Sequence, residues 1–111
     1  MLLPHVDQAI VAVEKLTDYL LCKQHPTGKH KARFFRGLGF SLEEPELFRT
    51  CLLNHARSNL VVIEEVTPFG IKYVIDGAIV APNGSSPRVR VVWIVESGTQ
   101  SPRLVTAFPH D

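Results

Sequence analysis

Four short runs that alternate apolar and polar residues fill the second half of the chain, and they limit the possible folds more than any other feature. The runs are residues 59–66, 71–80, 88–96 and 103–108, and segments rich in glycine, proline and serine separate them. Alternation with period two is typical of half-buried β-strands. Because the connections between the runs are short, the pattern predicts an antiparallel meander of four strands.

The first 58 residues have a different pattern, in which apolar positions recur at helical spacing. The β-branched start of the first segment favours an extended chain, so we expect an extended arm up to Val13 and a helix from there through Leu21. A second helix is expected from Lys29 to about Leu38, because Gly39 follows as a C-terminal signal.

A third helix is expected in the segment that starts at Ser41. This residue has the N-cap position, and Glu44 stands three residues later, as in a capping box. Helices followed by a meander predict an α+β fold in which N-terminal helices pack on one face of a four-stranded antiparallel sheet. The 111 residues are enough for a single domain, mainly helical over 1–58 and an antiparallel sheet over 59–109.

Composition excludes several functional classes. The chain is 45% hydrophobic and 21% charged, which is typical of a folded globule, and its net charge of +1 means that any affinity for nucleic acid depends on a local patch. Cys22 and Cys51 stand apart, as isolated thiols do in a reducing compartment, and no apolar run is long enough for a membrane span. With no signal segment at the N-terminus, these features predict a cytoplasmic protein.

The histidines and motifs predict neither a metal nor a cofactor. His5, His55 and His110 are scattered along the chain without the spacing of a metal-binding pair. The sequence also contains no phosphate-binding loop and no signature of a serine or cysteine nucleophile.

A local basic patch does occur in the segment HPTGKHKARFF, residues 25–35. On a helix, Lys29 and Arg33 lie on one basic stripe, whereas Lys31 shares a side with the phenylalanines, so its stem would lie on the core while its ammonium reaches the surface. A lysine held in this way suits an anion site, since its position is fixed in advance. The simpler alternative is a solvated basic face.

Acid–base chemistry in this region would come from His25 or His30, because a histidine exchanges protons near neutral pH. The alternatives are a turn histidine bonded to nearby backbone and an exposed helix residue. On the last strand, Thr106 is either a β-forming core residue or a hydroxyl that opens into a cleft. Arg88 and Arg103 begin two strands and would form a basic end of the sheet if those strand starts lie together.

The succession KLTDYLL, HPTGKHKARFF, LGF, APNG, VWIV and PRLVT, which extends from Lys15 to Thr106, resembles a small uncharacterised bacterial domain family. Members of that family occur as stand-alone proteins and as C-terminal tips of polymorphic toxins. The layout of helices before a four-stranded sheet, and an ending that reads Thr106, Ala107, Phe108 and Pro109, is also similar to the barnase, RelE and anticodon-nuclease colicin group.

This resemblance implies a metal-independent ribonuclease that acts on RNA and leaves 2′,3′-cyclic phosphate ends. The implied catalytic residues are His25, His30 and Lys31, and the implied substrate-binding residues are Lys29, Arg33, Arg103 and Thr106. Phe108 departs from the group, in which a tyrosine is common at that position. The general base is unassigned, since Glu64 and Glu65 qualify only if the first strand borders the cleft.

The alternative function is non-catalytic. A basic helix on a compact α+β body would dock an acidic partner, such as an antitoxin or an immunity protein. The two hypotheses differ at Lys31→Ala, which would abolish turnover in an enzyme but only weaken binding in a docking module.

Overall fold

The computed structural model describes residues 1–26 and 28–110 and has the α+β architecture that the sequence predicts. Its helical elements are η1 (Val6–Gln8), α1 (Val13–Lys15), the π-helical turn η2 (Leu16–Leu20), α2 (Lys29–Gly37) and α3 (Pro45–Ser58). Its strands are β1 (Val61–Thr67), β2 (Gly70–Ala78), β3 (Arg88–Glu96) and β4 (Arg103–Pro109). They form one antiparallel sheet in the order β1-β2-β3-β4, which confirms the predicted meander.

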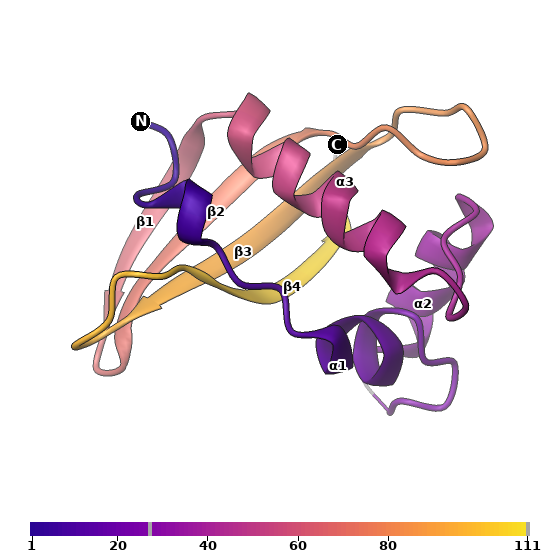
Figure 1. Ribbon diagram of the computed structural model, residues 1–111, viewed down its shortest axis with the longest axis horizontal. Coiled ribbons are helices and arrows are strands. Elements are labelled where there is room, and N and C mark those ends of the chain that lie inside the picture. The colour runs from indigo at the N-terminus through magenta and orange to yellow at the C-terminus, as the bar shows by residue number, and fades with distance from the viewer. Residues whose placement is uncertain (27, 111) are drawn as a thin grey trace.

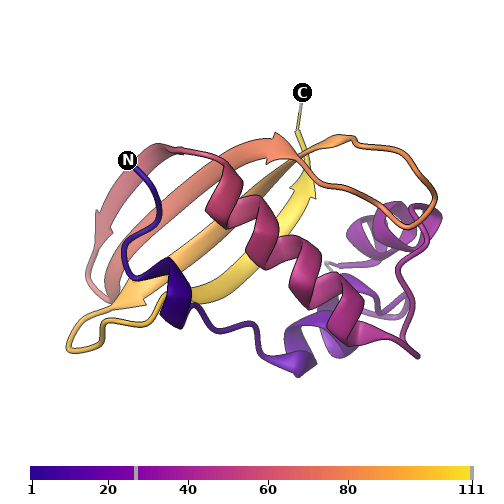
Figure 2. The same ribbon diagram turned by 45° about the horizontal axis from the view of Figure 1, so that its top comes forward.

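The helices lie on one side of the sheet and beside its β4 edge. Helix α3 runs across one face of the sheet, with η1 on the same side, while α1, η2 and α2 gather near β4 (Figures 1 and 2). Trp93 of β3 is fully buried at this interface, together with Phe48 and Leu52 of α3 and Phe35 of α2. Each such aromatic or aliphatic side chain stabilises the fold by roughly 1.5–3 kcal/mol through its burial.

The N-terminal arm extends the sheet at β4. The N–H of Ile10 donates to the Pro102 carbonyl (2.7 Å), and the N–H of Leu104 donates to the Ile10 carbonyl (3.0 Å). The chain is therefore extended here, as predicted, before it becomes helical at Val13. This contact covers part of an edge strand whose backbone groups would otherwise face solvent.

The predicted N-cap of the third helix is wrong. Helix α3 begins at Pro45, and the residue at its N-cap is Glu44, without a side-chain cap hydrogen bond. Proline suits the first helical position because that position needs no N–H donor and its fixed φ is already helical. Ser41 instead accepts the N–H of Glu44 at its own carbonyl (3.3 Å), in a turn before the helix.

Strand β4 contains a bulge that alternation alone did not reveal. Leu104 pairs with Trp93 and Thr106 pairs with Val92, so Val105 is an extra residue between the two pairs. Strict alternation along the strand would place Leu104 and Thr106 on one face, but this is wrong for β4 because a bulge reverses the alternation beyond it. Leu104 is buried in the core, whereas Thr106 turns to the other side of the strand.

The predicted basic end of the sheet is also wrong. Antiparallel neighbours start at opposite ends, so Arg88 lies beside His110 while Arg103 lies opposite Ile94. Arg103 donates from Nε to the Glu96 carboxylate (2.9 Å), which offsets its charge.

Among the described residues, no helix is both long enough and apolar enough to cross a bilayer.

Candidate functional site

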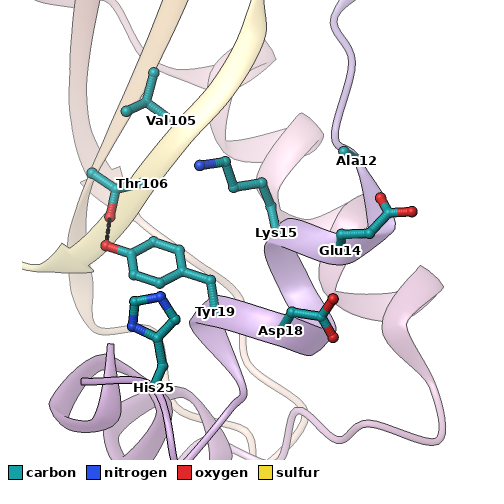
Figure 3. Close-up of a pocket in the computed structure, with 8 residues that line it drawn as sticks. All are labelled: Ala12, Glu14, Lys15, Asp18, Tyr19, His25, Val105 and Thr106. Atoms are coloured by element: carbon teal, nitrogen blue, oxygen red, sulfur yellow. Dashed lines mark hydrogen bonds between the residues drawn. The ribbon is translucent and has the colours of Figure 1, made fainter. Parts of the chain in front are cut away.

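An open pocket of about 670 Å³ lies between the first helical segment and β4. Its walls come from α1, η2, the turn after η2, and the bulged part of β4 (Figure 3). The residues that line it are Ala12, Glu14, Lys15, Asp18, Tyr19, His25, Val105 and Thr106. Segments far apart in the sequence thus supply polar side chains to one concave surface, which is the usual form of a ligand site.

Tyr19 occupies the middle of this pocket. It belongs to η2, where the N–H of Leu21 bonds the carbonyl of Leu16 (2.8 Å), five residues earlier. Such π-turns are rare and occur frequently at functional sites. The Tyr19 hydroxyl lies 3.0 Å from the Thr106 hydroxyl (Figure 3), and the bulge at Val105 is what turns Thr106 toward it.

Two lysines surround the Tyr19 ring. The Lys31 ammonium donates a hydrogen bond to the Tyr19 hydroxyl (2.9 Å) and lies 5.3 Å from the centre of its ring. It also lies 5.9 Å from the ring centre of Phe108. The Lys15 ammonium is 5.5 Å from the centre of the Tyr19 ring, and it reaches across the pocket toward β4 in Figure 3. The lysines therefore concentrate positive charge around one phenol.

This environment favours ionisation of the phenol. Burial of Tyr19 opposes ionisation, but the hydrogen bond from Lys31, the hydrogen bond with Thr106, and the positive charges of Lys31 and Lys15 outweigh it. The pKa of Tyr19 is therefore lower than the usual tyrosine value. A lowered pKa increases the fraction of the phenol that is ionised, and only the ionised form can accept a proton.

His25 packs against Tyr19 from the turn that precedes α2. The two ring centres are 4.9 Å apart, and the rings meet edge to face (Figure 3). The N–H of Gly28 donates to His25 Nδ1 (3.0 Å). A neutral imidazole that accepts at Nδ1 carries its proton on Nε2, so this ring is arranged to donate from Nε2.

Gly28 makes the close approach of α2 to Tyr19 possible. A Cβ at this position would lie 2.8 Å from Cδ1 of Tyr19 and 2.9 Å from its carbonyl oxygen. Any side chain would therefore push η2 and α2 apart. The glycine within the basic segment thus has a structural reason, since it brings Lys31 and His25 onto Tyr19.

The other predicted site residues lie elsewhere. Lys29, His30 and Arg33 are exposed on α2, and none of them lines the pocket. Arg103 is paired with Glu96, as described above. On α2 the stripe that contains Lys29 and Arg33 thus faces solvent. This agrees with the simpler alternative for these residues, a solvated basic face.

Three of the predicted residues do come together, because His25, Lys31 and Thr106 all contact Tyr19. Sequence reasoning missed Tyr19 itself. One signal was present, since Lys15 precedes Tyr19 by four residues and the two share a helix face. Among residues 1–26 and 28–110, no group of three or more histidine, cysteine, aspartate or glutamate side chains has a metal-binding arrangement.

The chain belongs to the family described as Domain of unknown function (DUF6883), whose model matches residues 2–111. Its fold is similar to that of a chain in the contact-dependent growth inhibition toxin–immunity protein complex from Klebsiella pneumoniae 342. The TM-score is 0.74 and the identity 18%, over 92% of this chain and 100% of that chain. At this identity the likeness establishes the fold. No curated protein matches the sequence.

Proposed function

We propose that this domain is a toxin-like, metal-independent ribonuclease that cleaves RNA at the Tyr19 pocket. The observation that carries the proposal is the hydrogen-bonded row Lys31–Tyr19–Thr106, with His25 against the same phenol. The row combines a proton acceptor of lowered pKa, a proton donor and fixed cations, which are the groups that phosphodiester cleavage requires. The fold shared with a chain of a toxin–immunity complex supports the toxin-like role.

In the proposed reaction, Tyr19 acts as the general base. Its oxygen takes the proton of a ribose 2′-hydroxyl, and the resulting 2′-oxygen attacks the adjacent phosphorus. The bond from phosphorus to the 5′-oxygen breaks, and His25 in its imidazolium form gives the Nε2 proton to that leaving oxygen. This imidazolium forms by protonation at Nδ1, which replaces the hydrogen bond from the Gly28 N–H at that atom. The products are a 2′,3′-cyclic phosphate and a free 5′-hydroxyl, with no oxidant or metal in the balance.

Lys31 and Lys15 have an electrostatic role in this mechanism. Negative charge grows on the non-bridging phosphate oxygens as the 2′-oxygen attacks, and ammonium groups already in place stabilise it without reorganisation. The same charges keep the pKa of Tyr19 low before the substrate reacts. Thr106 fixes the phenol from the other side and orients it toward the pocket.

The test is cleavage of total RNA and tRNA in the presence of EDTA, followed by analysis of the product ends. We expect cyclic-phosphate ends from the wild type. Tyr19→Phe should lower the rate by about 100-fold or more, since removal of a general base typically costs 10²–10⁴ in rate. Lys31→Ala and His25→Ala should each lower kcat as well, while circular dichroism shows an intact fold.

The matched control is His30→Ala. It removes the same ring five residues further along, from an exposed position on α2. We expect its rate to stay close to that of the wild type. Cleavage that ceases in EDTA, or that continues unchanged in Tyr19→Phe, would contradict the proposal.

A second candidate function is the docking of an acidic immunity-type protein on α2. The exposed residues Lys29 and Arg33 favour it, because they present positive charge away from the pocket, and His30 is exposed between them. Such a surface attracts an acidic partner and accelerates its association at low salt.

The docking surface and the pocket can be tested separately. Lys29→Glu with Arg33→Glu should weaken the binding of an acidic candidate partner by about tenfold or more in titration calorimetry, because like charges would then face each other. His25→Ala should leave that affinity unchanged. Equal binding by the charge-reversed variant would exclude α2 as the docking surface.

A further inference from the structure

The face of the sheet turned away from α3 carries a second polar group, separate from the pocket. Asp76, Arg90 and Phe108 stand directly opposite one another on β2, β3 and β4. Arg90 donates to both Asp76 oxygens, from Nε (2.8 Å) and from a terminal nitrogen (2.9 Å). His110 Nε2 lies 3.8 Å from the same carboxylate. These residues form a connected cluster at one end of this sheet face, which we call the open face.

The charges in this cluster are unequally matched. Asp76 neutralises Arg90 through the two hydrogen bonds, and its side chain is only 11% exposed. Arg88 lies two residues before Arg90, so it shares this face of β3, and it is exposed. His110 is 38% exposed. Among residues 28–110, Arg88 therefore adds a positive charge at this end of the face that Asp76, already bonded to Arg90, does not neutralise.

The Phe108 ring also lies near a lysine of α2. The Lys31 ammonium, which holds Tyr19 in the pocket, lies 5.9 Å from the centre of this ring. Aromatic side chains beside positively charged groups are typical of a single-strand binding surface, since a base stacks on the ring while phosphates meet the cations. The ring is half-buried, so part of its surface remains open.

The spacing along β4 fits a polynucleotide. Thr106, Phe108 and His110 alternate along the strand and share the open face. Positions two residues apart on a strand are separated by roughly 6.6–6.8 Å, so Thr106 and His110 are about 13 Å apart. Each step of roughly 6.6–6.8 Å is comparable with the spacing of consecutive nucleotides in an extended single strand. One phosphate near Thr106 and another about two nucleotides later near His110 would therefore match the strand.

We infer that the substrate strand leaves the Tyr19 pocket along the open face of β4, with a base on Phe108 and a following phosphate at Arg88 and His110. This inference rests on the proposed function and narrows its substrate to single-stranded RNA longer than a dinucleotide. Asp76 is a positioning residue in this arrangement, because it fixes Arg90 and lies 3.8 Å from His110 Nε2, beside the path of the strand along β4 (the track).

The binding test uses a six-nucleotide 2′-O-methyl RNA, which has no free 2′-hydroxyl and is not cleaved by this mechanism. Fluorescence anisotropy would compare the wild type with Arg88→Ala and with Arg88→Ala combined with His110→Gln. We expect the double variant to bind about 5–10-fold more weakly. The dependence of log affinity on log salt should become shallower by about one for each phosphate that the variant no longer neutralises.

The matched control is Arg57→Ala. It removes an exposed arginine from α3, on the opposite side of the sheet, and changes the net charge as much as Arg88→Ala does. We expect wild-type affinity and salt dependence from this variant. A loss equal to that of Arg88→Ala would mean that only total charge matters, which would overturn the inference.

Cleavage assays separate this inference from the proposed function. With an active wild type, the double variant should lose more kcat/KM on a six-nucleotide RNA than on a dinucleotide, since only the longer substrate reaches His110. The proposed path of the strand along β4 would be wrong if the double variant lost the same kcat/KM on both substrates. It would also be wrong if the double variant bound the 2′-O-methyl RNA as tightly as the wild type does. A wild type that binds this RNA in the expected way but cleaves none would leave the track standing and exclude the ribonuclease.

Discussion

Tyr19 and Tyr73 are the two tyrosines of the chain, and their environments shift their pKa values in opposite directions. Burial and then the nearby Glu64 carboxylate raise the pKa of Tyr73, whereas the lysines and Thr106 lower that of Tyr19. Ultraviolet titration of the folded protein should therefore give two separate phenolate steps. Tyr19→Phe should remove the lower step, and Lys31→Met should move it to higher pH, because the variant lacks the positive charge.

Tyr73→Phe is the control for this titration. It should remove the upper step and leave the lower one in place. A single step that contains both tyrosines would contradict the account of Tyr19 as an activated phenol, whatever the cleavage assays give.

Asp76 should make stability depend on pH. The hydrogen bonds from Arg90 lower its pKa most; burial opposes them, and the charges of Arg90, His110 and Arg88 add to the lowering. The ionised carboxylate therefore stabilises the fold above the ordinary carboxyl pKa of about 4, and this contribution is lost as pH falls through the lower folded value. We expect Asp76→Asn to lower the urea midpoint at pH 7 and to approach the wild type in acid.

The urea midpoints of the wild type and of Asp76→Asn, measured from neutral to acidic pH, check this expectation. The difference between them should shrink as the pH falls. A difference that stays constant over the whole range would show that Asp76 stabilises the fold through packing and not through its charge.

At the level of single residues, the sequence was informative where chemistry is local. His25 and Lys31 were singled out from their neighbours along the chain, and Thr106 through the resemblance of the last strand; each contacts Tyr19, and their roles stay predictions. The importance of Tyr19 was not visible in the sequence. Its hydroxyl partners are 12 and 87 residues away, and only the folded chain brings them within hydrogen-bonding distance.

Among the elements, the junction of η2 and α2 gives the sharpest expectation. Gly28→Ala introduces a methyl group against the ring and carbonyl of Tyr19, so it should cost about 1–3 kcal/mol and displace the phenol from Thr106. We expect lower stability and a Tyr19 pKa closer to its ordinary value. Chemical denaturation and the ultraviolet titration measure the two effects.

Gly37→Ala is the matched change at the other end of α2. A Cβ there meets no atom within 4 Å, and alanine is the better helix former. This variant should be neutral or more stable by about 0.5 kcal/mol, with an unchanged Tyr19 titration. Destabilisation at both glycines would mean that α2 tolerates no added side chain, and the specific role of Gly28 would be lost.

The limits of prediction for whole elements have identifiable causes. Strand β3 was predicted over its full length, residues 88–96, because alternation and flanking turns agree there. The bulge at Val105 was missed, since an extra residue in one strand depends on how it pairs with its neighbour. The start of α3 was misplaced because Pro45 begins a helix without help from Ser41.

Local unfolding of the molecule should begin at the β1 edge of its sheet. Strand β3 pairs on both edges and contains the fully buried Val91 and Trp93, whereas β1 is an edge strand and residues 62–66 are exposed. In native-state hydrogen exchange, amides of residues 89–95 should therefore exchange slowly as one block, and those of β1 faster. Fast exchange throughout β3 would contradict the meander and the site built on it.

The distance in sequence between Tyr19 and Thr106 determines when the pocket can form during synthesis and folding. The phenol belongs to the first helical segment, and the hydroxyl that fixes it belongs to the last strand, 87 residues later. During synthesis the pocket does not exist until both segments have been made. The Tyr19 pocket is therefore complete only after the final strand has docked, and any activity of this pocket requires the whole domain to be folded.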